Sequence, residues 1–260
     1  MRENNVKKVV AQGGTVVNGW LGIPSAVSAE FMALQGWDSM CIDLQHGLVD
    51  YQASVGMMQA ISTTGVTPLV RVPWNEPGDI MKALDAGAYG IICPMVNTKA
   101  QCEEFVSACR YAPTGHRSWG PVRGIVYGGA DYFDKANSTI LTMAMIETQE
   151  ALDNMDAIMS VKGLDGIYVG PSDLGISLGF APGFDPVEQK LIDAFTKIAQ
   201  AAKKHGLIAG IHCGSSAYGL KMAGLGYNFI TILNDIRLMA WAAKNAVQAV
   251  KSGKLAPNAP

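Results

Sequence analysis

Several polar side chains follow short apolar runs in this chain, and their types suit proton transfer, anion binding and metal binding. Asp43 and His46 occur in CIDLQHG, Arg71 in PLVRV, Glu147 in MIETQE and Asp173 in VGPSDLG. Histidine titrates near neutral pH, so His46 is a candidate general base. A buried arginine needs an anionic partner, and its rigid fork makes Arg71 a candidate anchor for a substrate carboxylate or oxyanion.

Glu147 and Asp173 together indicate a metal site. Two carboxylates without a thiolate or a histidine cluster suit a hard divalent cation that keeps several water ligands. We therefore expect Mg²⁺ or Mn²⁺, with Co²⁺ as a substitute, and no organic cofactor. The structural alternatives are that the two acids form ion pairs at the mouth of the fold, or that Arg71 is their salt-bridge partner.

The segment 170–175, GPSDLG, reads as a tight turn. Its backbone N–H groups can bind a carboxylate, which would place Ser172 and Asp173 beside a substrate. The alternative is a stiff loop without a ligand. His212 follows another apolar run, and we interpret it as a structural histidine, with substrate contact as the alternative.

A repeated pattern of helix, glycine and apolar run must position these side chains. It recurs in MALQGWDSMCID (32–43), ALDAGAYGIICP (83–94), GLDGIYVGP (163–171) and MAGLGYNFITIL (222–233). Glycine readily ends a helix, and an apolar run without polar alternation is typical of a strand covered on both faces. The repetition therefore predicts parallel β/α units.

Eight such units predict an α/β fold, a (β/α)8 TIM barrel, as a single domain spanning residues 1–260. We expect strands near 17–22, 39–43, 67–71, 90–94, 141–146, 166–170, 207–212 and 228–233. We expect helices near 26–35, 51–63, 77–86, 98–110, 150–160, 186–205, 215–224 and 235–251. No GxGxxG follows the first run, which disfavours an open doubly wound sheet. In such barrels the active site lies at the carboxyl ends of the strands, where the polar residues above fall.

One connection, residues 111–138, is long and contains seven glycines and prolines together with arginines and aromatic residues. Long loops are usually functional or disordered. We therefore expect either a lid or subunit contact, or a mobile surface excursion.

Composition excludes several classes of protein. Hydrophobic residues make up 49% of the chain, charged residues 16%, and the net charge is −2. These values argue against disorder, and the scattered Lys and Arg argue against nucleic-acid or membrane partners. Five cysteines without a CxxC pair, a polar N-terminus and no long apolar stretch predict a cytoplasmic protein with reduced thiols.

Four motifs together make the chain resemble the HpcH/HpaI family of class II, metal-dependent pyruvate aldolases. They are IDLQHG (42–47), VRVPWNEP (70–77), IET (146–148) and GPSDL (170–174). The resemblance covers nearly the whole chain. It implies a C-terminal helix exchanged between the subunits of a homotrimer or homohexamer.

The resemblance also implies residue roles. His46 matches the base, Arg71 the residue that binds the 2-oxo acid and stabilises its enolate, and Glu147 and Asp173 the metal ligands. Ser172 falls where a backbone amide meets the substrate carboxylate.

Asp85 matches an acid that raises the basicity of the catalytic histidine. Our map places Asp85 at the end of the helix near 77–86, on the far side of its own barrel, so it reaches only a neighbouring subunit unless that helix boundary is wrong. The chain also departs from similar sequences, which often carry Glu where it has Gln45 and Gln where it has Met145. The second departure removes an amide and reshapes the pocket for the donor.

The resemblance implies reversible aldol addition and cleavage between the enolate of a 2-oxo acid, pyruvate or hydroxypyruvate, and an aldehyde. No lysine ends a strand as a Schiff-base nucleophile, which favours the metal route. The alternatives are a related barrel lyase that cleaves a hydroxyacyl-CoA or decarboxylates a 2-oxo acid, and a non-enzymatic barrel that binds a small acid. No basic cluster suggests a CoA groove.

Overall fold

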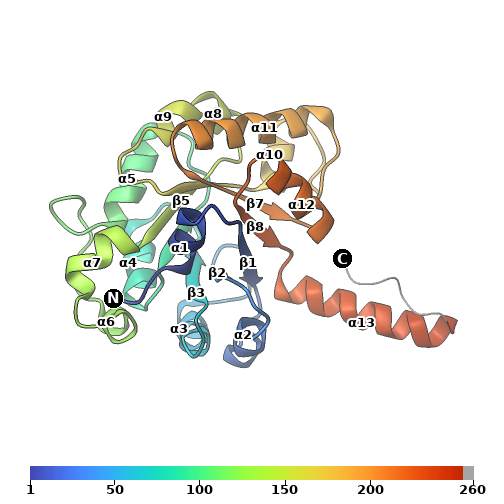
Figure 1. Ribbon diagram of the computed structural model, residues 1–260, viewed down its shortest axis with the longest axis horizontal. Helices are drawn as coiled ribbons and strands as arrows, with labels where there is room; N and C mark the ends of the chain where they lie inside the picture. The colour runs from blue at the N-terminus through green and yellow to red at the C-terminus, as the bar shows by residue number, and fades with distance from the viewer. Residues whose placement is uncertain (254–260) are drawn as a thin grey trace.

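The computed structural model describes residues 1–253, and within them eight parallel strands close into a barrel in sequence order (Figure 1). The strands are β1 (Val16–Leu21), β2 (Ser39–Asp43), β3 (Thr67–Arg71), β4 (Gly90–Cys93), β5 (Leu141–Met145), β6 (Gly166–Val169), β7 (Ile208–Cys213) and β8 (Phe229–Ile232). Asn18 of β1 is in register with Ser39 of β2 and Thr231 of β8, which closes the barrel. The predicted (β/α)8 barrel is confirmed, and residues 254–260 of the predicted domain lie outside the described part.

The strands are buried on both faces, as their uninterrupted apolar runs predict. One cluster fills the barrel interior, and it includes Trp20, Leu69, Met143, Tyr168 and Phe229. A larger cluster packs the outer faces of the strands against the surrounding helices. The strand ends therefore stand on a rigid, close-packed scaffold.

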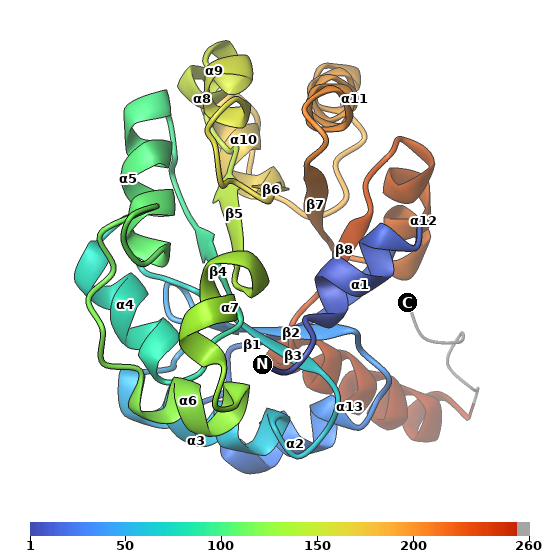
Figure 2. The ribbon, with the colours of Figure 1, turned by 60° about the vertical axis from the view of Figure 1, so that its left-hand side comes forward.

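Most helices agree with the predicted ones, and Figure 2 shows those that cover the barrel around the strands. They are α2 (Ala26–Ala33), α3 (Tyr51–Ile61), α4 (Pro77–Asp85), α5 (Lys99–Cys109), α8 (Gln149–Asp153), α9 (Met155–Met159), α11 (Gln189–Lys204), α12 (Ser216–Gly224) and α13 (Asp235–Ser252). Their starts are set by local chemistry: Thr98 and Gln101 form a capping box at α5, and Asn234 caps α13. The single helix expected near 150–160 is two short ones, α8 and α9.

Four helices were not predicted: α1 (Asn5–Ala11), α6 (Val122–Gly128), α7 (Tyr132–Thr139) and α10 (Pro171–Ser177). Helix α1 contributes Val6 to the interior cluster. Helices α6 and α7 occupy the long connection expected at 111–138, where a Cβ at Gly124 or Gly128 would crowd the Tyr132 ring. Glycine lowers helix propensity, but here it allows close packing that the sequence pattern does not reveal.

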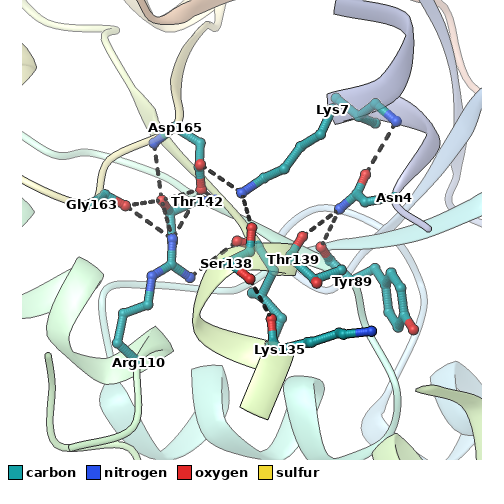
Figure 3. A network of polar contacts seen from close by, with 12 residues as sticks. Asn4, Lys7, Tyr89, Arg110, Lys135, Ser138, Thr139, Thr142, Gly163 and Asp165 are labelled. Carbon is teal, nitrogen blue, oxygen red and sulfur yellow. Dashed lines mark hydrogen bonds and ion pairs between the residues drawn. The ribbon is translucent and has the colours of Figure 1, made fainter. Parts of the chain in front are cut away.

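A polar network ties α5 and α7 to β5 and the segment before β6 (Figure 3). Buried Arg110 donates to Asp165, to the hydroxyl of Thr142 and to the carbonyls of Ile140 and Gly163. Lys7 of α1 adds a second ion pair to Asp165, with 2.8 Å between Nζ and Oδ1. These contacts lie around the amino ends of β5 and β6, so they support the barrel rather than the polar side chains at the carboxyl ends.

Helix α13 extends away from the barrel (Figure 1). Asp235 is its only buried residue within the described chain, and its carboxylate accepts hydrogen bonds from the N–H groups of Gly22 and Ile23. Met239, Val247 and Val250 are exposed further along the helix. Exchange of this helix between subunits stays a prediction. No helix within residues 1–253 has the length and hydropathy needed to cross a bilayer.

Candidate active site

A cavity of about 320 Å³ opens at the carboxyl ends of the strands. It brings together four residues predicted to act there: His46, Arg71, Ser172 and Asp173. Its other lining residues are Trp20, Asp43, Met145, Tyr168, Gly170, Pro171, Phe184, His212, Asn234 and Arg237. The size suits a small-molecule site.

Asp43 and Arg71 form a bidentate ion pair on this wall. Arg71 Nε donates to Asp43 Oδ1 at 2.9 Å and Nη2 to Oδ2 at 2.6 Å. The two residues end neighbouring strands in direct register, and Trp20 Nε1 donates to Asp43 Oδ2 at 3.1 Å. Neither Glu147 nor Asp173 is therefore the ion-pair partner of Arg71, contrary to the structural alternative. The register of β2 and β3, which only the structure shows, sets these two side chains opposite each other.

This pair keeps both of its members charged. Burial alone raises the pKa of Asp43, but the hydrogen bonds and charge of Arg71, together with the N–H of Trp20 and the backbone N–H of His46, lower it overall. Burial opposes the charge of Arg71 in turn, and the hydrogen bonds from Asp43 raise the pKa of the guanidinium overall. Arg71 is thus a fixed positive charge facing the cavity.

His46 lies in the turn that follows β2. Asp43 Oδ1 accepts hydrogen bonds from the backbone N–H groups of Gln45 and His46, at 3.1 and 3.2 Å. The same carboxylate therefore orients Arg71 and shapes the loop that carries the imidazole. His46 is exposed at the cavity, where it can exchange protons with a bound molecule or with water.

Glu147 lies directly behind the cavity wall. Its side chain is buried, and Oε1 accepts a hydrogen bond of 2.8 Å from the backbone N–H of Met95, which has a φ of 55°. A Cβ on Gly170 would collide with Glu147 Oε2, so any other residue there would displace this carboxylate. A left-handed φ at a non-glycine residue is strained backbone, and here that conformation presents the donor to the carboxylate.

The pKa of Glu147 is raised to about 7, first by burial and then by the negative charge of Asp173, against the Met95 N–H and Arg71. A buried carboxyl beside a second carboxylate is a pair whose negative charge a divalent cation would neutralise. No group of three His, Cys, Asp or Glu residues in the described chain forms a fuller ligand set. A pair of carboxylates suits a cation such as Mg²⁺ that keeps water ligands, so the residues present fit the predicted metal.

His212 and Tyr168 form the inner part of the cavity. Tyr168 Oη lies 3.2 Å from His212 Nδ1, and the imidazole packs edge-on against Trp20. Burial first, and the charge of Arg71 second, lower the pKa of His212 to about 3. His212 is therefore neutral at physiological pH. It is packed and hydrogen-bonded as interpreted, and it also faces the cavity.

Asp85 lies elsewhere. It ends α4, accepts a hydrogen bond of 2.7 Å from Arg117 Nη2, and lines a separate cavity with Gly120 and Arg123. Within one chain the structure does not bring Asp85 and His46 to the same cavity. Arg117 belongs to the connection 111–138. Its buried guanidinium therefore joins that segment to the end of α4.

Comparisons with known proteins agree with the barrel fold. A model of the HpcH/HpaI aldolase/citrate lyase family matches residues 19–218. The chain belongs to this family. It is 40% identical to a hydroxypyruvate/pyruvate aldolase of Rhizorhabdus wittichii, across 94% of this chain and 97% of that protein. It is 33% identical to a 4-hydroxy-2-oxo-heptane-1,7-dioate aldolase of Shigella sonnei, across 93% of each. A solved HpcH/HpaI family structure from Burkholderia cenocepacia superposes with a TM-score of 0.89, at 29% identity over 95% of this chain and 99% of that one.

In this member of the HpcH/HpaI family, sequence reasoning missed four lining residues: Trp20, Tyr168, Phe184 and Arg237. Trp20 and Tyr168 read as ordinary core residues, and Phe184 lies in a segment without a pattern. A further signal appears only in the backbone. Three non-glycine residues within 1–253 have positive φ, Met95, Asp185 and Leu233, and all three lie in loops at the carboxyl face of the barrel. Such strain gathers at functional sites.

Proposed function

We propose that this chain is a divalent-metal-dependent aldolase, a carbon–carbon lyase that joins the enolate of a 2-oxo acid to an aldehyde and reverses the reaction. One observation carries the proposal. The Asp43-held guanidinium of Arg71 and the carboxylate of Asp173 line one small cavity at the carboxyl face of the barrel, and Glu147 lies behind its wall, near enough for the charge of Asp173 to raise its pKa. Homologues named as aldolases, 32–40% identical over most of the chain, support the same reaction class.

Each residue then has a role. Glu147 and Asp173 hold the cation, which when bound acts as a Lewis acid toward the oxygens of the 2-oxo acid. Arg71 places a fixed positive charge beside the oxygen on which negative charge develops in the enolate. The backbone N–H of Ser172 binds the substrate carboxylate. The Ser172 hydroxyl is not available for this role, because it donates to the carbonyl of Gly183 at 3.3 Å. His46 takes the proton from the carbon next to the oxo group of the donor, directly or through a water, and a proton returns to the aldehyde oxygen once the carbon–carbon bond has formed.

Asp85 acts on His46 only if a second copy of the chain brings it there. Its position at the end of α4, away from its own cavity, supports a homo-oligomer in which one subunit completes the site of another. The exposed apolar residues of α13 support an exchange of that helix. We propose a trimer or hexamer in the cytoplasm.

Two residues bear on the choice of donor. Met145 lines the cavity as an apolar side chain beside Gly170, and Gln45 precedes His46. With no amide at position 145, recognition of the donor falls to Arg71 and the cation. Both pyruvate and hydroxypyruvate fit these groups. The first relatives, named hydroxypyruvate/pyruvate aldolases, support both donors.

The alternative reactions have less support. The cavity has no lysine among its lining residues, so an imine route has no candidate nucleophile there. Cleavage of a hydroxyacyl-CoA needs a groove for adenine and phosphates. The cavity is small and carries two arginines among its lining residues, so it does not offer such a groove. The names of the relatives do not favour this alternative.

The test is an assay panel on chelator-treated protein reloaded with Mg²⁺, Mn²⁺ or Co²⁺. It crosses pyruvate and hydroxypyruvate with short and long aldehydes, and it includes a hydroxyacyl-CoA. We expect turnover only with metal and free 2-oxo acids, and loss of turnover in Glu147→Ala and Asp173→Ala. Full activity of either variant without metal, or a covalent adduct trapped by borohydride, would overturn the proposal.

A further inference from the structure

A second arginine, Arg237, stands at the mouth of the same cavity. It lies in the first turn of α13, its side chain is exposed, and its Cζ is 4.8 Å from the centre of the Phe184 ring. Arg71 already forms an ion pair with Asp43, whereas Arg237 forms no ion pair with an acidic side chain of residues 1–253. Arg237 therefore presents an uncompensated positive charge to the cavity.

The loop that carries the Phe184 ring is anchored beneath this guanidinium. The neighbouring Asp185 accepts hydrogen bonds from the Gly214 N–H and the Ser215 hydroxyl, both at 2.6 Å. A Cβ on Gly214 would lie 2.6 Å from Phe184 Cβ, so the loop packs directly on the backbone after β7. Asp185 adopts a left-handed φ of 54° to make this connection. A fixed ring gives the guanidinium a defined resting plane.

The cavity wall beside Phe184, formed by His212, is uncharged. The His212 ring centre lies 5.6 Å from that of Phe184, and burial and nearby arginines keep this imidazole neutral. The charge of Arg237 is among the groups that lower the pKa of His212, so its field reaches into the cavity. A guanidinium stacked on an aromatic ring keeps its N–H donors free at the edge, where they can bind an anion with two parallel hydrogen bonds.

We propose that Arg237, stacked on Phe184, is an anion-binding subsite for the acceptor aldehyde, so that this chain prefers aldehydes that carry a carboxylate or a phosphate. This rests on the proposed aldolase function. The donor occupies the wall of Arg71, Glu147 and Asp173, and the acceptor lies between the donor and Arg237. The 2-oxo acid and the aldehyde then each have their own arginine.

The test compares matched acceptors with saturating pyruvate and Mg²⁺. One pair is succinic semialdehyde and butanal, and the other is glyceraldehyde 3-phosphate and glyceraldehyde. Arg237→Gln should lower kcat/KM for a charged acceptor about ten-fold or more, the loss of one charge-assisted hydrogen bond, and leave its neutral partner within about two-fold. A loss confined to the carboxylate pair or to the phosphate pair identifies which anion the subsite takes.

Lys244→Gln is the matched control, because it removes the same charge from an exposed position of α13 that does not line the cavity. Equal loss on charged and neutral acceptors, or no loss on either charged acceptor, overturns the subsite.

If wild-type protein turns over no aldehyde, the aldolase proposal fails and the subsite is judged by binding instead. Titration calorimetry with succinate, in the presence of pyruvate and Mg²⁺, should then show about ten-fold weaker binding to Arg237→Gln than to Lys244→Gln. Equal binding to the two variants overturns the subsite.

Discussion

The burial of the Glu147 carboxyl leads to an unusual prediction. Replacing this residue with an uncharged one should stabilise the metal-free protein. In the fold its pKa is about 7, against an ordinary value of 4.5, chiefly because of burial. The folded state therefore binds more protons than the unfolded state between these pH values, and the free energy of unfolding falls as pH rises through this window. The full change, from 4.5 to about 7, corresponds to about 3 kcal/mol above pH 7.

Glu147→Gln keeps an oxygen for the Met95 N–H but cannot ionise. In urea unfolding with chelator at pH 8, we expect this variant to be more stable than wild type by up to about 3 kcal/mol, with most of the difference gone at pH 5. Mg²⁺ at pH 8 should stabilise wild type and not the variant, because it neutralises the paired acids only in wild type. Glu104→Gln makes the same chemical change at an exposed position of α5 and should show neither effect. Parallel pH profiles of Glu147→Gln and wild type would refute the reasoning.

Three further substitutions test other parts of the structure. Gly170→Ala drives a methyl group into Glu147 Oε2 and should weaken Mg²⁺ binding, measured by calorimetry, about ten-fold or more. Gly175→Ala, in the helix that Gly170 precedes, meets only ordinary contacts and should not weaken it. Arg71→Lys loses the bidentate geometry and should lower kcat/KM about 100-fold in steady-state assays with little change in Tm; retained activity would remove Arg71 from the reaction. Arg110→Met breaks a buried network far from the cavity and should cost about 3 kcal/mol of stability in urea unfolding at unchanged kcat/KM, so a selective loss of activity would contradict its structural role.

Local patterns explain why the barrel itself was predictable. The predicted strands agree with the observed ones to within one residue at each end, because an apolar run flanked by glycine has few other ways to be buried. Helix α6 was missed because its glycines, Gly124 and Gly128, argue against helix locally and serve packing on Tyr132 instead. Helix α7 contains no glycine, but it is short and follows directly on this glycine-rich segment. The sequence predicts a turn at α10 because Gly170 precedes it and Pro171 and Gly175 lie within it, although Pro at the first helical position is favourable.

The sequence by itself determined which strand ends carry the acids, the arginine and the histidine, because parallel strands bring their carboxyl ends to one face whatever the details of packing. Tertiary structure alone decided the partners: that Asp43 pairs with Arg71, that Asp85 pairs with Arg117 away from His46, and that Arg237 rests on Phe184. These pairings join segments far apart in the chain, and they depend on register, loop path and burial. No local pattern encodes those distances, so they emerge only when the barrel closes.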